Sequence, residues 1–283
     1  MAKKAYIGVN NVARKIKKGY VGVNGVARKI KKAYIGVGGV ARPFWSGGEL
    51  AYYGEITQLS MDRTDLAATT VGGYALFGGG VYNYNFQSTV DAYNTSLTRS
   101  TPTSLSKGRQ YLAATTVGNY ALFGGGLYSG DYTAVDAYNT SLTRSTPTAL
   151  SVGRYCLAAT TVGGYALFGG GNDQANDYTD RVDAYNTSLT RSTPTALTYG
   201  KYNLSATTVG DYALFSNGYT YMGSNYKGTV DAYDSSLVHS TPTALAYNRQ
   251  NGAATTVGDY ALFGGGNTMG TNRCCVVEAY AVR

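Results

Sequence analysis

The chain has 283 residues, of which 43% are hydrophobic and 14% charged, and its formal net charge is +8. After Met1-Ala2-Lys3-Lys4 there is no apolar stretch of the kind found in secretion signals, and no run of about 18 apolar residues occurs that would span a membrane. The three cysteines are too few for a disulfide framework, and no His or Cys lies at zinc-ligand spacing. We therefore expect a protein made in a cytoplasm, without a signal peptide, membrane insertion, metal or cofactor.

Residues 1–46 contain a 14-residue repeat marked by Tyr6, Tyr20 and Tyr34. In each copy a Tyr-Ile-Gly-Val or Tyr-Val-Gly-Val run is followed by two turn residues, such as Asn24-Gly25, and then by Val-Ala-Arg. Asn-Gly and related pairs between short β-forming runs are a strong hairpin signal, so this segment predicts an antiparallel meander of about six short strands. Neither face of such a sheet is large enough for a core, so we expect the meander to dock on something else.

The positive charge belongs to this first part, which holds eleven of the 24 lysines and arginines and none of the 16 acidic residues. A basic arm can bind nucleic acid, an anionic cell-wall polymer or an acidic protein surface. Alternatively, the Lys-Lys pairs simply keep turns and sheet edges soluble. We predict that residues 1–46 form an anchor. Its candidate contact residues are Tyr6, Arg14, Lys15, Tyr20, Arg28, Lys29, Tyr34 and Arg42.

From Leu66 onward the chain consists of five near-copies of one unit, whose phenylalanine recurs every 45 to 48 residues. That period is the length of a four-stranded β-propeller blade. An Ala- and Thr-rich run predicts the inner strand, Tyr-Ala-Leu-Phe the second, Val-Asp-Ala-Tyr the third, and a segment carrying Pro102 the outer strand. The sequence predicts an all-β fold, with a five-bladed β-propeller over residues 47–283 and a β-hairpin repeat arm over residues 1–46. The repeated phenylalanines are Phe77, Phe123, Phe168, Phe215 and Phe263.

The two ends of this array complement each other. Residues 275–280 repeat the third strand and the chain then stops, whereas residues 50–60 resemble a fourth strand and the segment that leads into the first copy. We expect the fifth blade to be closed by the N-terminal strand 50–60, because closure removes exposed sheet edges.

Over roughly residues 50–283 the array resembles the kelch family. The resemblance is carried by glycine runs such as Gly78-Gly79-Gly80, by a following tyrosine in each copy, and by a basic residue before each inner strand. Copy four departs from the pattern with Ser216-Asn217-Gly218, and the tryptophan typical of kelch outer strands is missing. The array therefore looks like a divergent kelch-like branch, for which the resemblance implies the fold but little of the function.

We expect no catalytic site. His239 is the only histidine and replaces an arginine of the sister copies, so we interpret it as a tolerated variant; the copper oxidases that share the kelch fold need a histidine pair. One acid recurs per copy, which indicates a structural role such as pairing with that copy's arginine. Non-repeated acids keep a glycosidase open as an alternative. The repeated acids are Asp91, Asp136, Asp183, Asp231 and Glu278; the non-repeated ones are Asp131, Asp173, Asp177 and Asp180.

The copies disagree mainly in the loops between their second and third strands and in the segments that lead into the inner strands. In an up-and-down blade both sets of loops emerge at the same end. They are rich in Tyr, Asn, Gly and Ser, a composition typical of adaptable binding surfaces, although relaxed loops also drift towards the small polar residues. We predict a binding face formed by Tyr82, Tyr84, Phe86, Tyr111, Tyr128, Tyr132, Tyr155, Tyr178, Tyr219, Tyr221 and Tyr226.

The N-terminal repeats resemble segments of structural proteins of phages and prophages of Gram-positive gut bacteria. This resemblance implies a virion protein, a tail fibre, receptor-binding or head-fibre subunit, that attaches to other virion structural proteins through residues 1–46. It also implies a homo-oligomer on the particle that presents the propeller to a glycan or protein of the host-cell surface. The alternatives are a glycosidase or depolymerase acting on cell-surface polysaccharide, and a cytoplasmic protein-interaction scaffold.

Overall fold

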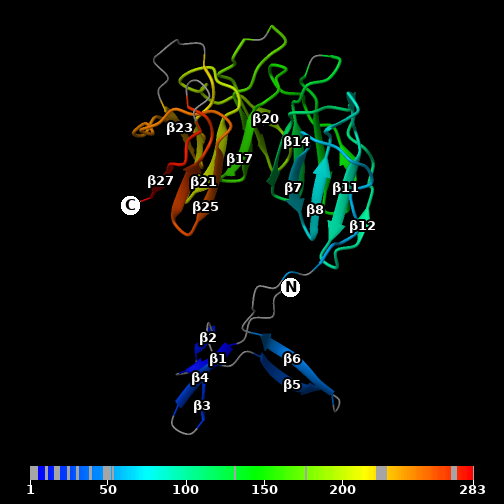
Figure 1. Cartoon of the computed structure of the whole chain (residues 1–283), viewed down its shortest axis with the longest axis vertical. Coiled ribbons are helices and arrows are strands. Elements are labelled where there is room, and N and C mark those ends of the chain that lie inside the picture. Colours follow the sequence, from blue (N-terminus) through cyan, green and yellow to red (C-terminus); the bar gives the residue numbers. More distant parts are fainter. Residues whose placement is uncertain are drawn as a thin grey trace. The chain divides into compact units, whose positions relative to one another are not determined.

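The computed structural model describes residues 6–9, 12–15, 20–23, 26–29, 32–37, 40–46, 52, 54–130, 132–175, 177–220, 228–268 and 273–282. They belong to two compact units, Met1–Glu55 and Ile56–Arg283. We describe each unit by itself (Figure 1). The described residues form strands and turns and no helix, so the fold is all-β as predicted.

The first unit is built from two-stranded antiparallel hairpins, in which β1 pairs with β2, β3 with β4, and β5 with β6. In the first hairpin Val9 pairs with Val12, which leaves two residues for the turn, as the repeat predicts. Among the described residues no pairing joins one hairpin to the next, so separate hairpins take the place of the expected continuous meander. The strands are β1 (Tyr6–Val9), β2 (Val12–Lys15), β3 (Tyr20–Val23), β4 (Val26–Lys29), β5 (Lys32–Val37) and β6 (Val40–Ser46).

The second unit repeats one antiparallel sheet of four strands in chain order. The first sheet contains β7 (Ala67–Val71), β8 (Tyr74–Gly78), β11 (Val90–Asn94) and β12 (Arg99–Ser100), with a small hairpin of β9 (Val81–Tyr82) and β10 (Asn85–Phe86) in its loop. The second contains β13 (Ala113–Val117), β14 (Tyr120–Gly124), β15 (Val135–Asn139) and β16 (Arg144–Ser145). The third contains β17 (Ala158–Val162), β18 (Tyr165–Gly169), β19 (Val182–Asn186) and β20 (Arg191–Ser192).

The fourth sheet contains β21 (Ser205–Val209), β22 (Tyr212–Ser216), β23 (Val230–Asp234) and β24 (His239–Ser240). The last contains β25 (Ala253–Val257), β26 (Tyr260–Gly264) and β27 (Val277–Ala281), with no fourth strand among the described residues. Each outer strand is only two residues long and ends before the proline, as β12 does before Pro102, because proline has no N–H for the ladder. The repeated sheets give a propeller-like fold.

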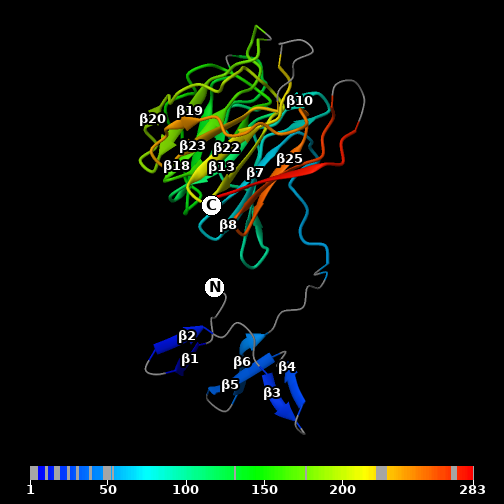
Figure 2. The same ribbon diagram turned by 90° about the vertical axis from the view of Figure 1, so that its left-hand side faces the viewer.

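The inner strands β7, β13, β17, β21 and β25 pack side by side in that order, and the sheets fan out from them (Figures 1 and 2). Threonine hydroxyls join neighbouring inner strands, as between Thr69 and Thr116 at 2.9 Å. The hydrophobic core lies between adjacent sheets. At the first three junctions the edge of a phenylalanine covers a glycine of the preceding sheet, and at the fourth junction the glycine position is Ser216. A Cβ at Gly124, for instance, would lie 2.7 Å from Phe168. A small residue is required there because the aromatic ring fills the space.

Each sheet also contains an ion pair, which is buried in the first four sheets and partly buried in the last, where Glu278 is 18% exposed. The Arg154 guanidinium lies 2.7 Å from the Asp183 carboxylate, and both side chains are fully buried. Asp183 also accepts hydrogen bonds from the backbone N–H and hydroxyl of Ser151, which precedes the inner strand. Buried charges are tolerated when they are paired and hydrogen-bonded in this way. The structural role predicted for the repeated acids is therefore confirmed. The other pairs are Arg63–Asp91, Arg109–Asp136, Lys201–Asp231 and Arg249–Glu278.

The outer faces of the first and last sheets are less well covered than the faces that meet another sheet. Val257 of β25 is 60% exposed, whereas its counterpart Val162 of β17 is 4% exposed. Phe77 of the first sheet is half-buried, although Phe123, Phe168, Phe215 and Phe263 are fully buried. No neighbouring phenylalanine covers Gly264 of the last sheet. In the described residues, the first and last sheets thus lack the contacts that join the other sheets.

The strand predicted over residues 50–60 is not present in its described part, residues 52 and 54–60. These residues contact the first sheet instead. The backbone N–H of Ser60 donates to Asp91, and the Tyr93 hydroxyl donates to the carbonyl of Thr57. In the second sheet Ser106 and Thr103 make the same contacts with Asp136 and Tyr138. Residues 56–63 therefore serve as the lead-in segment of the first sheet, because its buried aspartate needs these donors as the other aspartates do.

Candidate functional site

Two sets of connections meet at one end of the second unit. One set leads into the inner strands, and the other joins the second strand of each sheet to the third (Figure 1). An isolated β-bridge ties the two sets together in every copy, as between Thr64 and Val81 in the first. The connections differ between copies, whereas the Gly-x turns at the opposite end are nearly constant. We call the end formed by the first two sets the variable face.

One residue in each lead-in segment has a left-handed backbone conformation, with φ between 51° and 56°. These five residues form a hydrogen-bonded row, because from the second copy onward the N–H of each donates to the carbonyl of the equivalent residue in the preceding copy, at 2.9 to 3.2 Å. We call this row the axial ring. Its members are Asp65, Tyr111, Cys156, Asn203 and Asn251.

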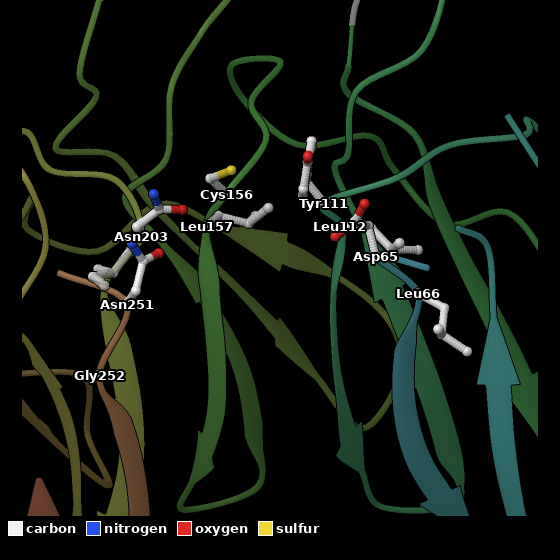
Figure 3. A pocket seen from close by; sticks show the side chains of 10 residues that line it. Asp65, Leu66, Tyr111, Leu112, Cys156, Leu157, Asn203, Asn251 and Gly252 are labelled. Carbon is white, nitrogen blue, oxygen red and sulfur yellow. The ribbon is translucent and has the colours of Figure 1, made fainter. Parts of the chain in front are cut away.

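The axial ring lines a cavity of about 380 Å³ (Figure 3). The residue that follows each ring member also lines the cavity; it is a leucine in four copies and Gly252 in the last. Figure 3 shows Asn203 and Asn251 together on one side, and Tyr111 with Asp65 on the other. Equivalent positions thus carry a carboxylate, a phenol, a thiol and two amides. The fold repeats here, but the chemistry of the side chains does not.

Asp65 governs the electrostatics of this cavity. Its negative charge, together with burial, raises the pKa of Tyr111. Burial, with a contribution from Asp65, raises the pKa of the Cys156 thiol to about 12. Because the thiolate is the nucleophilic form, this rise in pKa disfavours Cys156 as a nucleophile near neutral pH. The cavity therefore offers hydrogen-bonding groups and one carboxylate.

A groove of about 670 Å³ adjoins the cavity and shares Asp65 and Tyr111 with it. Its other wall is the β9–β10 hairpin, where Asn83 and Tyr84 make a two-residue turn with φ of 46° and 62°. Both turn residues need a positive φ in this type of hairpin, which suits asparagine better than tyrosine. The side chain of Tyr84 is fully exposed. The remaining lining residues are Asp62, Arg63, Thr64, Val81, Tyr82, Phe86 and Gln110.

The aromatic residues predicted as a binding face fall into three groups. Tyr82, Tyr84, Phe86 and Tyr111 line the groove. A second group is linked by ring contacts that run from Tyr111 through Tyr155 and Tyr132 to Tyr128. The third joins Tyr178 to Tyr219, with Tyr202 against both. The groove carries the more exposed aromatic side chains, because Tyr128 is buried and the other members of the second and third groups, apart from Tyr111, are half-buried.

Two predicted binding residues, Tyr221 and Tyr226, lie outside the described residues. The eight predicted anchor residues lie on strands of the first unit. Tyr6 is on β1, Arg14 and Lys15 on β2, Tyr20 on β3, Arg28 and Lys29 on β4, Tyr34 on β5 and Arg42 on β6.

Four members of the axial ring were not predicted from the sequence: Asp65, Cys156, Asn203 and Asn251. A positional signal was available, since every member follows the buried basic residue of its copy by two positions. The sequence did not indicate that these residues adopt a left-handed backbone conformation, which directs their five side chains to one cavity.

In the part of the chain that the structure describes, no group of three or more His, Cys, Asp or Glu residues is arranged to hold a metal ion. Nor do those residues include a helix long and apolar enough to cross a membrane. Cys156, Cys274 and Cys275 are free thiols.

Comparison with known proteins identifies the fold alone. No family model matches the sequence. No curated protein is detectably similar to it. Among solved structures, the chain is similar to the structure of YjhT, with a TM-score of 0.63 and 14% sequence identity over 78% of this chain and 82% of that chain.

Proposed function

We propose that this chain is a surface protein of a phage virion, of the tail-fibre, receptor-binding or head-fibre type. In this proposal residues 1–46 attach it to other virion structural proteins, and the variable face binds a glycan or protein of the host-cell surface. The protein acts by binding and has no catalytic site.

The observation that carries the proposal is the groove beside the axial cavity. Tyr84 is fully exposed, and Tyr82 and Phe86 are 43% and 38% exposed on the same small hairpin. Aromatic side chains gathered at one exposed place are a feature of binding sites, where they supply rigid contact area. Next to them the cavity supplies polar groups. A concave site with aromatic walls and a few polar groups is the usual form of a ligand site.

The hairpin repeats support the attachment role. Each hairpin of the first unit pairs only two strands among the described residues, and an isolated two-stranded hairpin is marginally stable in water. In this proposal, contacts with other copies or with a partner protein bury the surface that an isolated hairpin leaves exposed. Eleven basic residues and no acid in this segment favour an acidic partner surface. We infer a homo-oligomer on the particle for the same reason.

The glycosidase alternative rests on the non-repeated acids, of which Asp131 lies outside the described residues. Asp173 accepts hydrogen bonds from the backbone N–H groups of Ala175 and Asp177, each at 2.9 Å, and so fixes its own loop. Asp180 lies 3.9 Å from Arg181 in an exposed ion pair. These contacts give the acids structural roles, and we prefer the binding function.

We further propose that the second unit is a five-bladed kelch-like propeller whose first and last sheets meet through Phe77 and Gly264. Phe77 is the one repeat phenylalanine that is only half-buried, and Gly264 is the corresponding glycine without a phenylalanine against it. Joining them repeats the packing of Phe168 on Gly124 and covers the exposed face of β25.

Mass spectrometry of purified particles tests the virion assignment. We expect the chain in stoichiometric amounts in particles that have been freed of host protein by density centrifugation. Its presence in the host lysate with absence from such particles would contradict the assignment and favour the cytoplasmic scaffold. Release of sugars from isolated host cell walls by the pure protein would favour the depolymerase instead.

A further inference from the structure

Two members of the axial ring, Tyr111 and Cys156, adopt its left-handed backbone conformation at an energetic cost. Asparagine accepts a left-handed backbone readily, as at Asn203 and Asn251, but Tyr111 and Cys156 have φ of 55° and 54° in the same place. Unfavourable backbone conformations that a fold maintains cluster at ligand sites, where they direct a side chain. Here they direct Tyr111 and Cys156 to the cavity, which glycine at these positions would leave bare.

The charge of the site defines the class of ligand. Asp62 and Asp65 contribute carboxylates to the cavity and groove. Arg63, the basic residue of the lining, has a fully buried side chain that lies 2.7 Å from Asp91, so its charge is already paired. The Cys156 thiol is protonated, as shown above. Among the described lining residues, an anionic ligand would meet two carboxylates and no accessible cation. A neutral ligand would avoid this repulsion.

The polar groups suit a ligand with many hydroxyl groups. The amides of Asn203 and Asn251 each donate and accept hydrogen bonds, and the Asp65 carboxylate accepts them from the other side of the cavity (Figure 3). Leu66, Leu112 and Leu157 provide apolar surface between them. This mixture of amide, carboxylate and apolar groups matches a pyranose ring, which has hydroxyls at its edge and C–H groups on its faces.

The size and continuity of the site indicate an oligosaccharide. A cavity of about 380 Å³ is near the lower end of the range for ligand pockets, roughly 300 to 1,000 Å³, and so suits one or two sugar rings. Through Asp65 and Tyr111 it opens into the groove, where Tyr82 and Phe86 present aromatic surface. A chain that begins in the cavity can therefore continue along the β9–β10 hairpin.

We propose that the axial cavity and the adjoining groove together bind a neutral oligosaccharide. Its terminal unit lies in the axial ring, between Asp65 and the amides of Asn203 and Asn251, and its next units lie against Tyr82 and Phe86. The proposal rests on the binding function proposed above, and it narrows the choice between glycan and protein to an uncharged glycan.

The experiment uses the full chain and an array of defined oligosaccharides that contains neutral glycans and their sialylated, sulfated and uronic-acid counterparts. We expect binding to neutral glycans and at least tenfold weaker binding to the acidic counterparts. The strongest neutral glycan is then titrated calorimetrically against Asn203→Gly and Asp65→Asn, two changes that the left-handed backbone accepts. Each should weaken binding at least tenfold while the melting temperature stays near that of the parent.

Asp259→Asn is the matched control, because it removes one exposed carboxylate from a turn at the opposite end. It should leave the affinity unchanged. Preference for acidic glycans, or full affinity of a folded Asn203→Gly variant, would overturn the proposal. If the chain binds host cells but no glycan of the array, this inference fails while the proposed binding face stands, with a protein receptor. If the chain binds neither host cells nor glycans, both fail.

Discussion

Asn217 and Gly252 face each other across the junction between the fourth and fifth sheets, where the preceding junctions have a glycine and a leucine. A Cβ at Gly125 would lie 3.1 Å from Leu157, and one at Gly252 would lie 3.4 Å from the side-chain amide of Asn217. At this junction the larger residue, Asn217, therefore follows the second strand of the fourth sheet, and the glycine, Gly252, precedes the inner strand of the fifth. The other junctions have the reverse order. The exchange leaves a defect, because Asn217 is 2% exposed and neither polar atom of its side chain has a partner.

Restoring the glycine and leucine of the other junctions at positions 217 and 252 should have a non-additive effect on stability. Gly252→Leu alone should destabilise the fold, since the new side chain meets Asn217. With Asn217→Gly added, the leucine is accommodated and two unpaired buried polar atoms are removed. We expect a coupling free energy of about 1–3 kcal/mol from a double-mutant cycle of urea unfolding. Additive effects of the two changes would show that the residues do not interact.

The buried ion pairs should contribute strongly to stability when one partner is removed. Arg154→Met leaves the fully buried Asp183 with only its longer contact to Arg191, at 3.6 Å, and should cost about 3 kcal/mol of unfolding free energy. Arg154→Lys should cost much less, because Lys201 already makes the equivalent contact with Asp231 at 2.8 Å. Thermal unfolding of the two variants provides the comparison. Equal losses in both would mean that the guanidinium geometry matters more than the charge.

The pairing of Asp231 predicts how stability depends on pH. Burial alone would raise the pKa of Asp231, but the charge of Lys201 and hydrogen bonds from Lys201 and Thr198 outweigh it and hold the pKa below its ordinary value. A carboxyl whose pKa is lowered by folding stabilises the fold above its unfolded pKa, near 3.9, and this contribution is lost as the pH falls further. We expect the melting temperature to fall steeply below about pH 4.

Asp231→Asn supplies the control for this pH dependence. The variant should be less stable than the parent at pH 7, and its melting temperature should vary less between pH 5 and pH 3 because one titrating carboxylate is gone. An acid transition as steep as that of the parent would place the responsible groups elsewhere.

Closure of the propeller makes a separate prediction for Phe77. If its ring packs on Gly264, Phe77→Ala should destabilise the fold by nearly as much as Phe168→Ala, about 3–5 kcal/mol, because both changes empty an equivalent space. Guanidinium unfolding of both variants measures the difference. A loss for Phe77→Ala that is far below that for Phe168→Ala would contradict closure through these residues.

The first unit should be needed for assembly and dispensable for folding of the second. Residues 56–283 form their own compact unit, so a chain that starts at Ser46 is expected to melt like the second unit of the full chain. It should nevertheless fail to join particles or form oligomers. Normal assembly of this shortened chain would move the attachment surface to the second unit.

Much of the fold follows from the repeat. The Ala-Thr runs form the inner strands, the Tyr-Ala-Leu-Phe runs form the second strands, and each repeated acid pairs with the arginine or lysine of its copy. These features were predictable because each pattern is local and occurs five times. The contacts of residues 56–63 were harder to foresee. A lead-in segment and an outer strand look alike in sequence, and only the hydrogen bonds of Ser60 and Thr57 to the first sheet distinguish them.

The binding face could be predicted in outline and not in detail. Loop variation indicated which end of the sheets differs between copies. It did not indicate that Tyr128 is buried, since a tyrosine in a variable loop has no local pattern that reports its burial. Nor did it indicate the axial ring, whose members are distant in sequence and meet only because the inner strands pack side by side.

The proposal that the variable face binds the host cell is best tested by measuring host-cell binding of a variant of the β9–β10 hairpin. Replacing Tyr82 and Tyr84 with serine removes exposed aromatic surface from the groove and should leave stability nearly unchanged. Because a central aromatic contact is typically worth roughly 2 kcal/mol or more, we expect affinity for host cells to fall at least about 30-fold. Tyr212→Ser is the matched control, since Tyr212 is 39% exposed and follows a turn at the opposite end. We expect the hairpin variant to lose binding and the control to bind like the parent. Equal binding by both folded variants would show that the groove is not the receptor site.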